Sequence, residues 1–343
     1  MKAVGLFKYL PIDNPESLVD VEIPKPKPES HDLLVRVKAV SVNPVDTKIR
    51  APKEKVEKSP KILGWDAAGI VEETGEDVTL FKKGDEVYYS GSILRQGSNS
   101  EFQLVDERIT GRKPKNLSFE EAAALPLTTI TAWEGMFEQM VISSEDADQT
   151  KGKSILIIGG AGGVGSIAIQ LAKKLTGLKV IATASREETR NWCLSLGADF
   201  VINHFNSFRD ELNKIGIKEV DYAFCLNDTG KNFPKSAEVL KPFGRFCTII
   251  DVKPGEHLDT NLLRSKSGNF SWEFMFTKSS FQTPDMISQH KLLNITAKLV
   301  ENGIIKTTMR ENFGMLNAEN LRKAHAQIES GTTIGKIVLS GIE

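Results

Sequence analysis

The hydrophobic positions along this chain follow two different patterns, and the change falls near residue 154. Before it, residues 31–42 alternate hydrophobic and polar side chains, and the short strand-like segments 67–75 and 84–91 are bounded by glycine. Alternation of this kind is typical of half-buried strands, so we predict a β-rich first part of about 125 residues. The charged run 51–61 has no hydrophobic period, and we predict an exposed loop there.

From residue 154 onward, continuous hydrophobic runs alternate with segments that repeat hydrophobic residues at helical spacing. The predicted strands are residues 154–160, 179–185, 199–204, 220–228, 244–251 and 268–276, with helices between the first five. Strands that alternate with helices form a doubly wound parallel sheet, so the predicted fold class is α/β. Two more helical stretches, 285–302 and 317–330, and a last strand, 335–341, complete the chain.

Composition and charge argue against several classes of function. The chain has 343 residues, enough for two domains, and is 40% hydrophobic and 26% charged with a formal net charge of −1. We therefore expect neither a nucleic-acid partner nor a membrane partner. Cys193, Cys225 and Cys247 lack paired spacing, which predicts neither disulfides nor a cysteine metal site. The sequence has no leader-like segment and no run of about 18 hydrophobic residues, so we expect a cytoplasmic protein.

A glycine-rich turn, Gly160-x-Gly162-x-x-Gly165, stands directly between a predicted strand and a predicted helix. In this context the first glycine allows a tight turn, the second lets backbone N–H groups approach a pyrophosphate, and the third lets the helix pack against the strand. Gly163 and Val164 complete the expected cradle at the helix N-terminus. The alternative is a plain glycine-rich turn, but the surrounding βαβαβ pattern favours a dinucleotide site.

The end of the next predicted strand indicates which dinucleotide is bound. An NAD site usually has Asp or Glu at this position, whereas here the strand ends Ala184-Ser185-Arg186. Glu187 and Glu188 follow, where they are expected to open the next helix. The Arg186 guanidinium and the Ser185 hydroxyl suit a 2′-phosphate, so we predict NADP(H); the alternative is that Arg186 is a solvated surface residue.

Taken together, several motifs give the chain a resemblance to the medium-chain dehydrogenase/reductase superfamily over nearly its whole length. They lie at residues 42–48, 64–71, 81–91, 121–136, 159–173, 196–199 and 335–339. The resemblance implies a GroES-like catalytic domain formed by residues 1–127 and 276–343. A Rossmann NADP(H)-binding domain, residues 128–275, would be inserted between these two segments.

Zinc alcohol dehydrogenases of this superfamily have a cysteine where this chain has Asn43, and Gly-His-Glu where it has Gly64-Trp65-Asp66. They also carry a four-cysteine lobe, which this sequence lacks. A catalytic zinc needs three protein ligands such as Cys or His, and Asn43 and Trp65 cannot supply them. Trp65 either fills the space of the metal or packs in the core. The chain thus resembles the zinc-independent branch, which contains quinone oxidoreductases and enone reductases, and we expect no metal.

The segment 42–48 is expected to face the substrate. Lys48 and Asn43 are the candidate catalytic residues, because a lysine at position 48 could donate to a substrate carbonyl oxygen and stabilise an enolate. The alternative is that Lys48 is an exposed lysine. Asp46 is expected to order the turn through backbone hydrogen bonds, and we place it with Trp65 and Phe274 around the substrate pocket.

The resemblance also implies further cofactor contacts. His204 would lie near the adenosine 2′-phosphate, Lys336 near the pyrophosphate, and Asn227 and Ile249 beside the ribose and nicotinamide. The expected function is NADPH-dependent hydride transfer to a quinone or an α,β-unsaturated carbonyl. The alternatives are a metal-free alcohol or carbonyl dehydrogenase and a non-catalytic NADPH-binding protein. The predicted strand 268–276 would lie at a sheet edge, so we expect a homodimer joined there.

Overall fold

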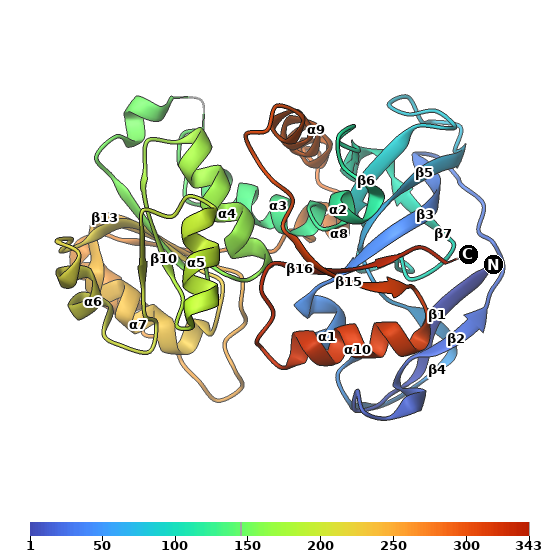
Figure 1. The fold of residues 1–343 in the computed structure, drawn as a ribbon, viewed down its shortest axis with the longest axis horizontal. Helices are drawn as coiled ribbons and strands as arrows, with labels where there is room; N and C mark the ends of the chain where they lie inside the picture. The colour runs from blue at the N-terminus through green and yellow to red at the C-terminus, as the bar shows by residue number, and fades with distance from the viewer. Residues whose placement is uncertain (145, 343) are drawn as a thin grey trace. The chain divides into compact units, whose positions relative to one another are not determined.

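The computed structural model describes residues 1–144 and 146–342 (Figure 1). The chain divides into two compact units. Unit 1 contains Met1–Ile130 and Phe276–Glu343, and unit 2 contains Thr131–Met275. Unit 1 is therefore built from both ends of the chain, and unit 2 is inserted between them.

Unit 1 is β-rich. Its strands form a three-stranded sheet in the order β2-β1-β4 and a seven-stranded sheet in the order β15-β16-β3-β5-β6-β8, with β7 paired to β3. The strands are β1 Lys2–Tyr9, β2 Val19–Glu22, β3 Asp32–Val42, β4 Lys53–Ile62, β5 Asp66–Thr74, β6 Glu86–Ser90, β7 Phe102–Asp106, β8 Thr110–Arg112, β15 Met309–Met315 and β16 Lys336–Ser340. The helices are α1 Pro44–Arg50, α2 Phe119–Ala123, α3 Pro126–Trp133 (which runs on into unit 2), α8 Thr277–Phe281, α9 Ile287–Glu301 and α10 Ala318–Glu329, with 3₁₀ turns η1 Pro15–Ser17 and η2 Glu107–Ile109.

The register of the larger sheet brings three strand ends together. Strand β3 pairs antiparallel with β5, where Ser41 faces Asp66, and with β16, where Val42 faces Ile337. The end of β3 and the starts of β5 and β16 therefore lie side by side. Helix α1 leaves the sheet directly after β3, so it begins at this same place.

The prediction of a loop at residues 51–61 was wrong. Residues Lys53–Ile62 form strand β4, which pairs antiparallel with β1 and matches Gly5 to Ile62. Because β4 lies at the edge of a three-stranded sheet, most of its side chains are exposed. Charged residues suit such an edge, since they discourage pairing with another chain. The hydrophobic period was absent because neither face of this strand is continuously buried.

Unit 2 contains a six-stranded sheet in the order β11-β10-β9-β12-β13-β14, in which each neighbouring pair is parallel. The strands are β9 Ser154–Ile158, β10 Lys179–Thr183, β11 Phe200–Ile202, β12 Val220–Cys225, β13 Leu240–Thr248 and β14 Asn269–Trp272. The helices are α4 Gly163–Leu175, α5 Glu187–Ser195, α6 Phe208–Lys214 and α7 Thr229–Val239, with a π-helix η3 Glu134–Gln139 and 3₁₀ turns η4 Ala147–Thr150 and η5 Thr260–Lys266. The strand order reverses between β9 and β12, which confirms a doubly wound α/β sheet.

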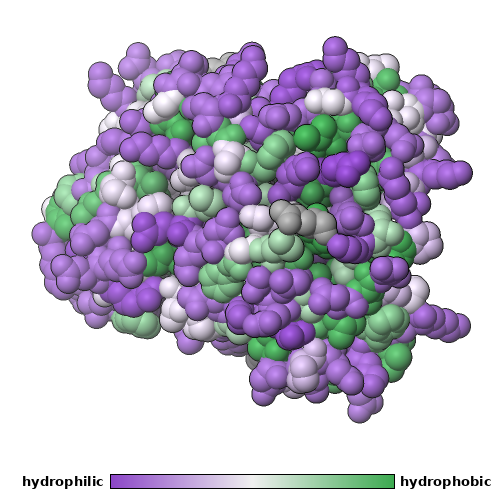
Figure 2. All heavy atoms as spheres, turned by 45° about the vertical axis from the view of Figure 1, so that its right-hand side comes forward, coloured by the Kyte–Doolittle hydropathy of each residue, from purple (hydrophilic) through white to green (hydrophobic). Residues whose placement is uncertain are grey.

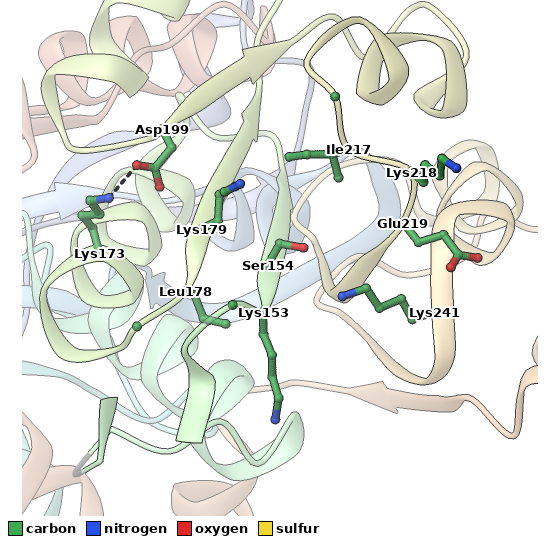
Figure 3. A pocket seen from close by; sticks show the side chains of 13 residues that line it. Lys153, Ser154, Lys173, Leu178, Lys179, Asp199, Ile217, Lys218, Glu219 and Lys241 are labelled. Carbon is green, nitrogen blue, oxygen red and sulfur yellow. Dashed lines mark hydrogen bonds and ion pairs between the residues drawn. The ribbon is translucent and has the colours of Figure 1, made fainter. Parts of the chain in front are cut away.

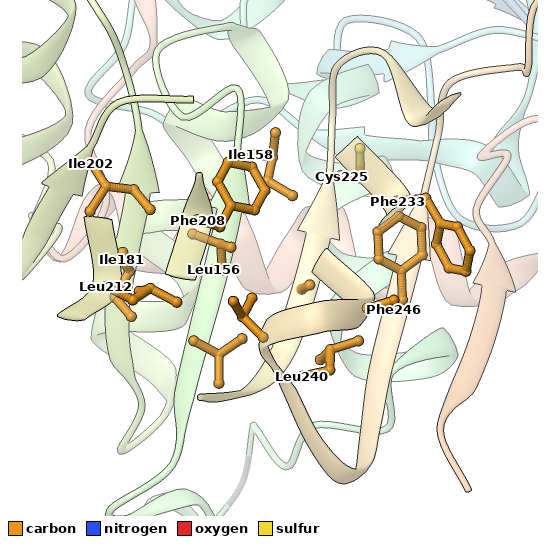
Figure 4. Packing of buried hydrophobic residues seen from close by; sticks show 14 of the residues in the cluster. Leu156, Ile158, Ile181, Ile202, Phe208, Leu212, Cys225, Phe233, Leu240 and Phe246 are labelled. Atoms are coloured by element: carbon orange, nitrogen blue, oxygen red, sulfur yellow. The ribbon is translucent and has the colours of Figure 1, made fainter. Parts of the chain in front are cut away.

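One compact hydrophobic core lies between the sheet of unit 2 and helices α6 and α7 (Figure 4). Phe233 of α7 meets Phe246 of β13 edge to face, with ring centroids 5.0 Å apart. Phe270 of β14 stacks on Phe246 with centroids 5.4 Å apart. These aromatic contacts stabilise the packing of β13 and β14 in the sheet, because each ring buries a large apolar area in a favourable geometry.

The predicted strand 268–276 is shorter in the structure, where β14 ends at Trp272. The Glu273 N–H still donates to the Thr248 carbonyl oxygen at 2.9 Å, but the pairing goes no further. Phe274 therefore lies outside the strand, and Met275 is the last residue of unit 2. The aromatic residues of this segment continue past Trp272 into the buried Met275 and Phe276, so the sequence does not mark where the strand ends.

Hydrophilic residues cover most of the face shown in Figure 2, and hydrophobic residues appear as smaller groups between them. Among the residues that the structure describes, none of the helices is both long enough and apolar enough to cross a membrane. All three cysteines are buried as free thiols, and burial raises the pKa of Cys193 to about 12.

Candidate functional site

The glycine-rich turn of unit 2 connects β9 to α4, and its packing explains why glycine is needed. A Cβ atom on Gly160 would lie 2.8 Å from the Cβ of Ala182, and one on Gly165 would lie 2.4 Å from the carbonyl oxygen of Gly159. Neither position has room for a side chain. Close packing of α4 against β9 and β10 therefore depends on these two glycines.

Gly162 is different, because a Cβ there would meet nothing closer than 3.6 Å. It is the N-cap of α4, which has 13 residues and begins at Gly163. The first N–H groups of a helix have no partner inside it, and the helix dipole favours an anion beside them. The open side at Gly162 thus leaves space for an anion beside the N–H groups of Gly163, Val164 and Gly165, where the sequence predicts the pyrophosphate.

The other predicted cofactor residues follow the carboxyl ends of neighbouring parallel strands. Ser185 and Arg186 come after β10, are exposed, and precede α5. The Arg186 N–H donates to Thr189 Oγ1 at 3.2 Å, which fixes the backbone where α5 begins. Asn227 and Ile249 come after β12 and β13. The sheet therefore brings these residues to the same edge as the glycine turn, which is where doubly wound folds bind ligands.

His204 follows β11 and is half-buried. Burial, assisted by the nearby Lys235 ammonium, lowers the pKa of this imidazole. The Lys235 ammonium donates to the His204 carbonyl oxygen at 3.0 Å and so ties α7 to this loop. A neutral imidazole at this position can contribute a hydrogen bond to a ligand rather than a charge.

A hollow of about 510 Å³ in unit 2 lies at the opposite edge of the sheet, where the strands begin (Figure 3). Its lining includes the starts of β9 and β10 and five lysines. Two of these lysines form ion pairs, Lys173 with Asp199 at 2.6 Å and Lys241 with Asp221 at 2.8 Å. Because ligands of doubly wound folds bind at the carboxyl ends of strands, this hollow is not the dinucleotide site.

Among the buried polar side chains of unit 1, four lie together at the end of β3, and we call them the Lys336 cluster: Asn43, Asp46, Asp66 and Lys336. The Lys336 ammonium donates to the Val42 carbonyl oxygen at 3.1 Å, to Asn43 Oδ1 at 2.5 Å and to Asp66 Oδ2 at 3.0 Å. An ammonium has three protons, so each is used.

The pyrophosphate contact expected for Lys336 from the resemblance stays a prediction, and the structure shows other partners for its ammonium. With only 3% of the residue exposed, its three donors are directed into unit 1. The register of β16 against β3 carries Lys336 to the start of β5, and this register is a long-range property that the motif 335–339 does not reveal.

The carboxylates of the cluster have different partners. Asp66 accepts from the Asn43 side-chain amide at 3.0 Å, from the Leu127 N–H at 2.8 Å and from Lys336. Burial raises the pKa of Asp66, while Lys336 and these donors oppose the rise. Asp46 Oδ2 accepts from the Asn43 N–H at 2.7 Å, which is the turn-ordering hydrogen bond expected from the sequence.

The second oxygen of Asp46, Oδ1, is buried and has no hydrogen-bond partner among the described residues. Burial of this carboxyl group raises its pKa to about 7, the negative charge of Asp66 adds to the rise, and the Asn43 N–H and Lys336 reduce it. The cluster has one permanent cation and two carboxyl groups. Burial raises the pKa of both carboxyl groups, and Asp46, with a pKa of about 7, can hold a proton near neutral pH.

Trp65 is fully buried and packs in the core of unit 1. Its ring meets Phe276 edge to face, with centroids 6.1 Å apart. An indole nitrogen is a hydrogen-bond donor and not a metal ligand, and the Asp66 carboxylate next to it is already paired with Lys336. No group of three or more His, Cys, Asp or Glu residues in the described part of the chain could hold a metal ion. These donors do not fit a catalytic zinc, which needs three such ligands.

The remaining candidates lie outside the cluster. Lys48 is on α1 and is exposed, and Phe274 belongs to unit 2, where half of its surface is exposed. The pairing of Asp66 with Lys336 is the feature that sequence reasoning missed. The two residues are 270 positions apart, and no periodic or spacing signal connects them.

Comparison with known proteins identifies the family. Residues 29–151 match the family described as the alcohol dehydrogenase GroES-like domain, and residues 196–339 match the family described as zinc-binding dehydrogenase. A zinc-type alcohol dehydrogenase-like protein of Staphylococcus aureus is 45% identical over 340 residues, covering 99% of this chain and 100% of that protein. The chain is a medium-chain dehydrogenase/reductase.

Other members of the superfamily have more specific names. The 2-methylene-furan-3-one reductase of Solanum lycopersicum is 40% identical over 355 residues, covering 100% of this chain and 79% of that protein. A crystal structure of a putative zinc-dependent alcohol dehydrogenase from Rhizobium etli has a TM-score of 0.94 and 49% identity, covering 100% of this chain and 98% of that one. The Escherichia coli quinone oxidoreductase in complex with NADPH has a TM-score of 0.80 and 25% identity, covering 99% and 100%.

This medium-chain dehydrogenase/reductase therefore has the GroES-like unit and the pyridine nucleotide-binding unit of its superfamily, and it is an oxidoreductase. The names of several relatives refer to zinc, whereas the donor set around Asn43, Trp65 and Asp66 does not suit that metal.

Proposed function

We propose that this protein is an NADPH-dependent reductase that transfers hydride to a quinone or an α,β-unsaturated carbonyl without zinc. The observation that carries the proposal is the Lys336 cluster. The Lys336 ammonium donates to the side chains of Asn43 and Asp66, and these side chains with Trp65 do not form the ligand set of a catalytic zinc. A reaction in this site must therefore proceed without a Lewis acid to stabilise an alkoxide.

A conjugated acceptor needs less support than a saturated carbonyl. When hydride adds to the β carbon of an enone, the negative charge spreads onto the carbonyl oxygen, and one cationic donor can stabilise it. Lys48, exposed on α1, is our candidate for that donor. A quinone accepts hydride more readily still, so it depends less on this lysine.

The hydride for such a reduction comes from the reduced nicotinamide when the cofactor is bound. The glycine turn and the N-terminus of α4 would hold its pyrophosphate. Ser185 and Arg186 would hold the 2′-phosphate, since Arg186 can form a charge-assisted pair with it. The NADPH bound to the E. coli relative and the substrates for which the tomato and E. coli relatives are named support this assignment.

The test is a substrate panel with the purified protein. We expect NADPH to be oxidised with enones and quinones, faster than NADH, and we expect a chelator to leave the rate unchanged. If saturated aldehydes are far better substrates than enones, the reaction is that of a carbonyl dehydrogenase and the proposed acceptor class is wrong. If the acceptors tried do not support NADPH oxidation, the proposal of an active reductase is rejected in favour of a binding protein.

A further inference from the structure

Helix α1, which carries Lys48, is too short to keep its own orientation. It has seven residues, and isolated helices of this length are unstable in water, so their position must come from tertiary contacts. Pro44 begins the helix and Asn43 is its N-cap. Contacts made by Asn43 therefore decide the direction in which the helix leaves strand β3.

Asn43 is held from three sides. Its N–H donates to Asp46 Oδ2, its side-chain amide donates to Asp66 Oδ2 at 3.0 Å, and its Oδ1 accepts from Lys336 at 2.5 Å. Lys336 also binds the carbonyl oxygen of Val42, the residue before Asn43. The Lys336 ammonium, at the start of β16, thus binds both the end of β3 and the start of β5, next to Asn43, the N-cap of α1.

A second buried cation holds the other end of α1. Arg50 is fully buried, donates to the Leu10 carbonyl oxygen at 2.5 Å and forms an ion pair with Glu329 of α10. Lys48 lies between the two anchors and is exposed. Contacts that fix both ends of this short helix therefore help to define the position of the Lys48 ammonium relative to unit 1.

We propose that Lys336 is a positioning residue, which holds Asn43 and thereby sets the placement of α1 and of the Lys48 ammonium for the reaction. This inference rests on the proposed function, in which Lys48 supports the developing enolate. Lys336 itself does not touch the substrate, because its three protons are committed to Val42, Asn43 and Asp66. The geometry of a positioned donor matters strongly, since an error of about 1 Å can reduce turnover about 100-fold.

Removing Lys336 alone would leave the Asp66 carboxylate buried without a cation, which destabilises folding by itself. The informative variant is therefore the neutral pair Asp66→Asn with Lys336→Met. The asparagine that replaces Asp66 can still accept from the Leu127 N–H, and the methionine stem fills nearly the space of the lysine. We expect this double variant to fold with a single cooperative transition, and its turnover on an enone to fall about 10-fold to 100-fold.

Coupling to Lys48 separates positioning from a purely structural role. We compare Lys48→Ala in the natural chain with Lys48→Ala in the neutral-pair background, by single-turnover rates with a saturating enone. If Lys336 acts through Lys48, the added Lys48→Ala change lowers the rate by less than about 3-fold in that background. The Michaelis constant for NADPH should not change, because the glycine turn belongs to unit 2.

If the neutral pair and Lys48→Ala lower the rate independently, so that their fold-reductions multiply in the combined variant, the inference is overturned. It is also overturned if the neutral-pair variant keeps the turnover of the natural protein. If Lys48→Ala alone leaves enone turnover intact, Lys48 is not the donor and the inference falls with it, although NADPH oxidation would still show a reductase. Absence of NADPH oxidation by the natural protein would instead reject the proposed function.

A milder variant keeps the test decisive if the neutral pair does not fold. Asn43→Ser retains an N-cap residue but cannot reach both Asp66 and Lys336. The matched control is Asn317→Ser at the N-cap of α10, where Asn317 Oδ1 accepts from the Asn320 N–H at 2.8 Å. We expect Asn43→Ser to lower enone turnover at least about 10-fold and Asn317→Ser to leave it unchanged. Equal turnover in these two variants would overturn the inference.

Discussion

Replacing Asp46 with asparagine should change the pH dependence of stability in unit 1. The amide oxygen of the new side chain can still accept from the Asn43 N–H, so the hydrogen bond at 2.7 Å is kept. The ionisable group is lost. Because Asp46 Oδ1 is buried without a partner among the described residues, the natural carboxylate is costly when it is charged.

The size of the effect follows from linkage. The pKa of Asp46 is about 7 in the folded protein, against about 3.9 in an unfolded chain. A raised folded pKa means that this group's stabilising contribution is fully present below about pH 4 and is lost as the pH rises through 7. Between pH 5 and pH 8 the free energy of unfolding of the natural protein should therefore fall by about 2.5 kcal/mol more than that of the asparagine variant.

The assay is urea unfolding at pH 5 and at pH 8, followed by tryptophan fluorescence. Trp65 is the one tryptophan of unit 1, since Trp133, Trp192 and Trp272 belong to unit 2. Replacing those three with phenylalanine in both proteins makes the signal specific for unit 1. The variant should gain stability relative to the natural protein as the pH rises.

The matched control is Asp13→Asn, which makes the same change at a position of unit 1 outside the buried cluster. A stability difference between the Asp46→Asn variant and the natural protein that is equal at pH 5 and pH 8 would refute the reasoning. If the variant instead loses stability relative to the natural protein as the pH rises to 8, the folded protein favours the charged form of Asp46. The shift of its pKa would then have the opposite sign.

Four further predictions concern cofactor, catalysis, metal and assembly. Arg186→Asp should shift preference from NADPH toward NADH, because it removes the guanidinium and restores an acceptor for the ribose 2′-OH; equal binding of both cofactors by the natural protein would contradict this. Lys48→Ala should lower enone turnover about 10²–10³-fold and quinone turnover less, with NADPH affinity little changed; unchanged enone turnover would remove Lys48 from the mechanism. Elemental analysis should find no stoichiometric zinc. If it finds about one zinc per chain, and removal of that zinc abolishes activity, the proposal of a metal-free reaction is contradicted. Light scattering should find a homodimer, because β14 is an edge strand with Trp272 half-exposed; a monomer at micromolar concentration would argue against pairing of these edges.

The alternation of strands and helices in unit 2 could be predicted from the sequence because its signals are local. A buried parallel strand is a continuous hydrophobic run, and a helix repeats its hydrophobic residues over three or four positions. The glycine turn is local as well, since Gly160 and Gly165 are needed for contacts between one strand and the helix that follows. The residue types at Asn43 and Trp65 were enough to argue against zinc, because ligand chemistry depends on the side chain alone.

Other features required the tertiary structure, because they depend on partners that are far apart in the sequence. Strand β4 forms because β1 offers it an edge, although its own residues carry no hydrophobic period. Trp65 packs as a core residue because Phe276, which follows directly after the end of unit 2, lies beside it. Lys336 belongs to the buried cluster because the register of β16 against β3 places it beside Asp66. A buried charge needs a partner wherever the chain provides one, and that partner is chosen by the folded sheet rather than by sequence spacing.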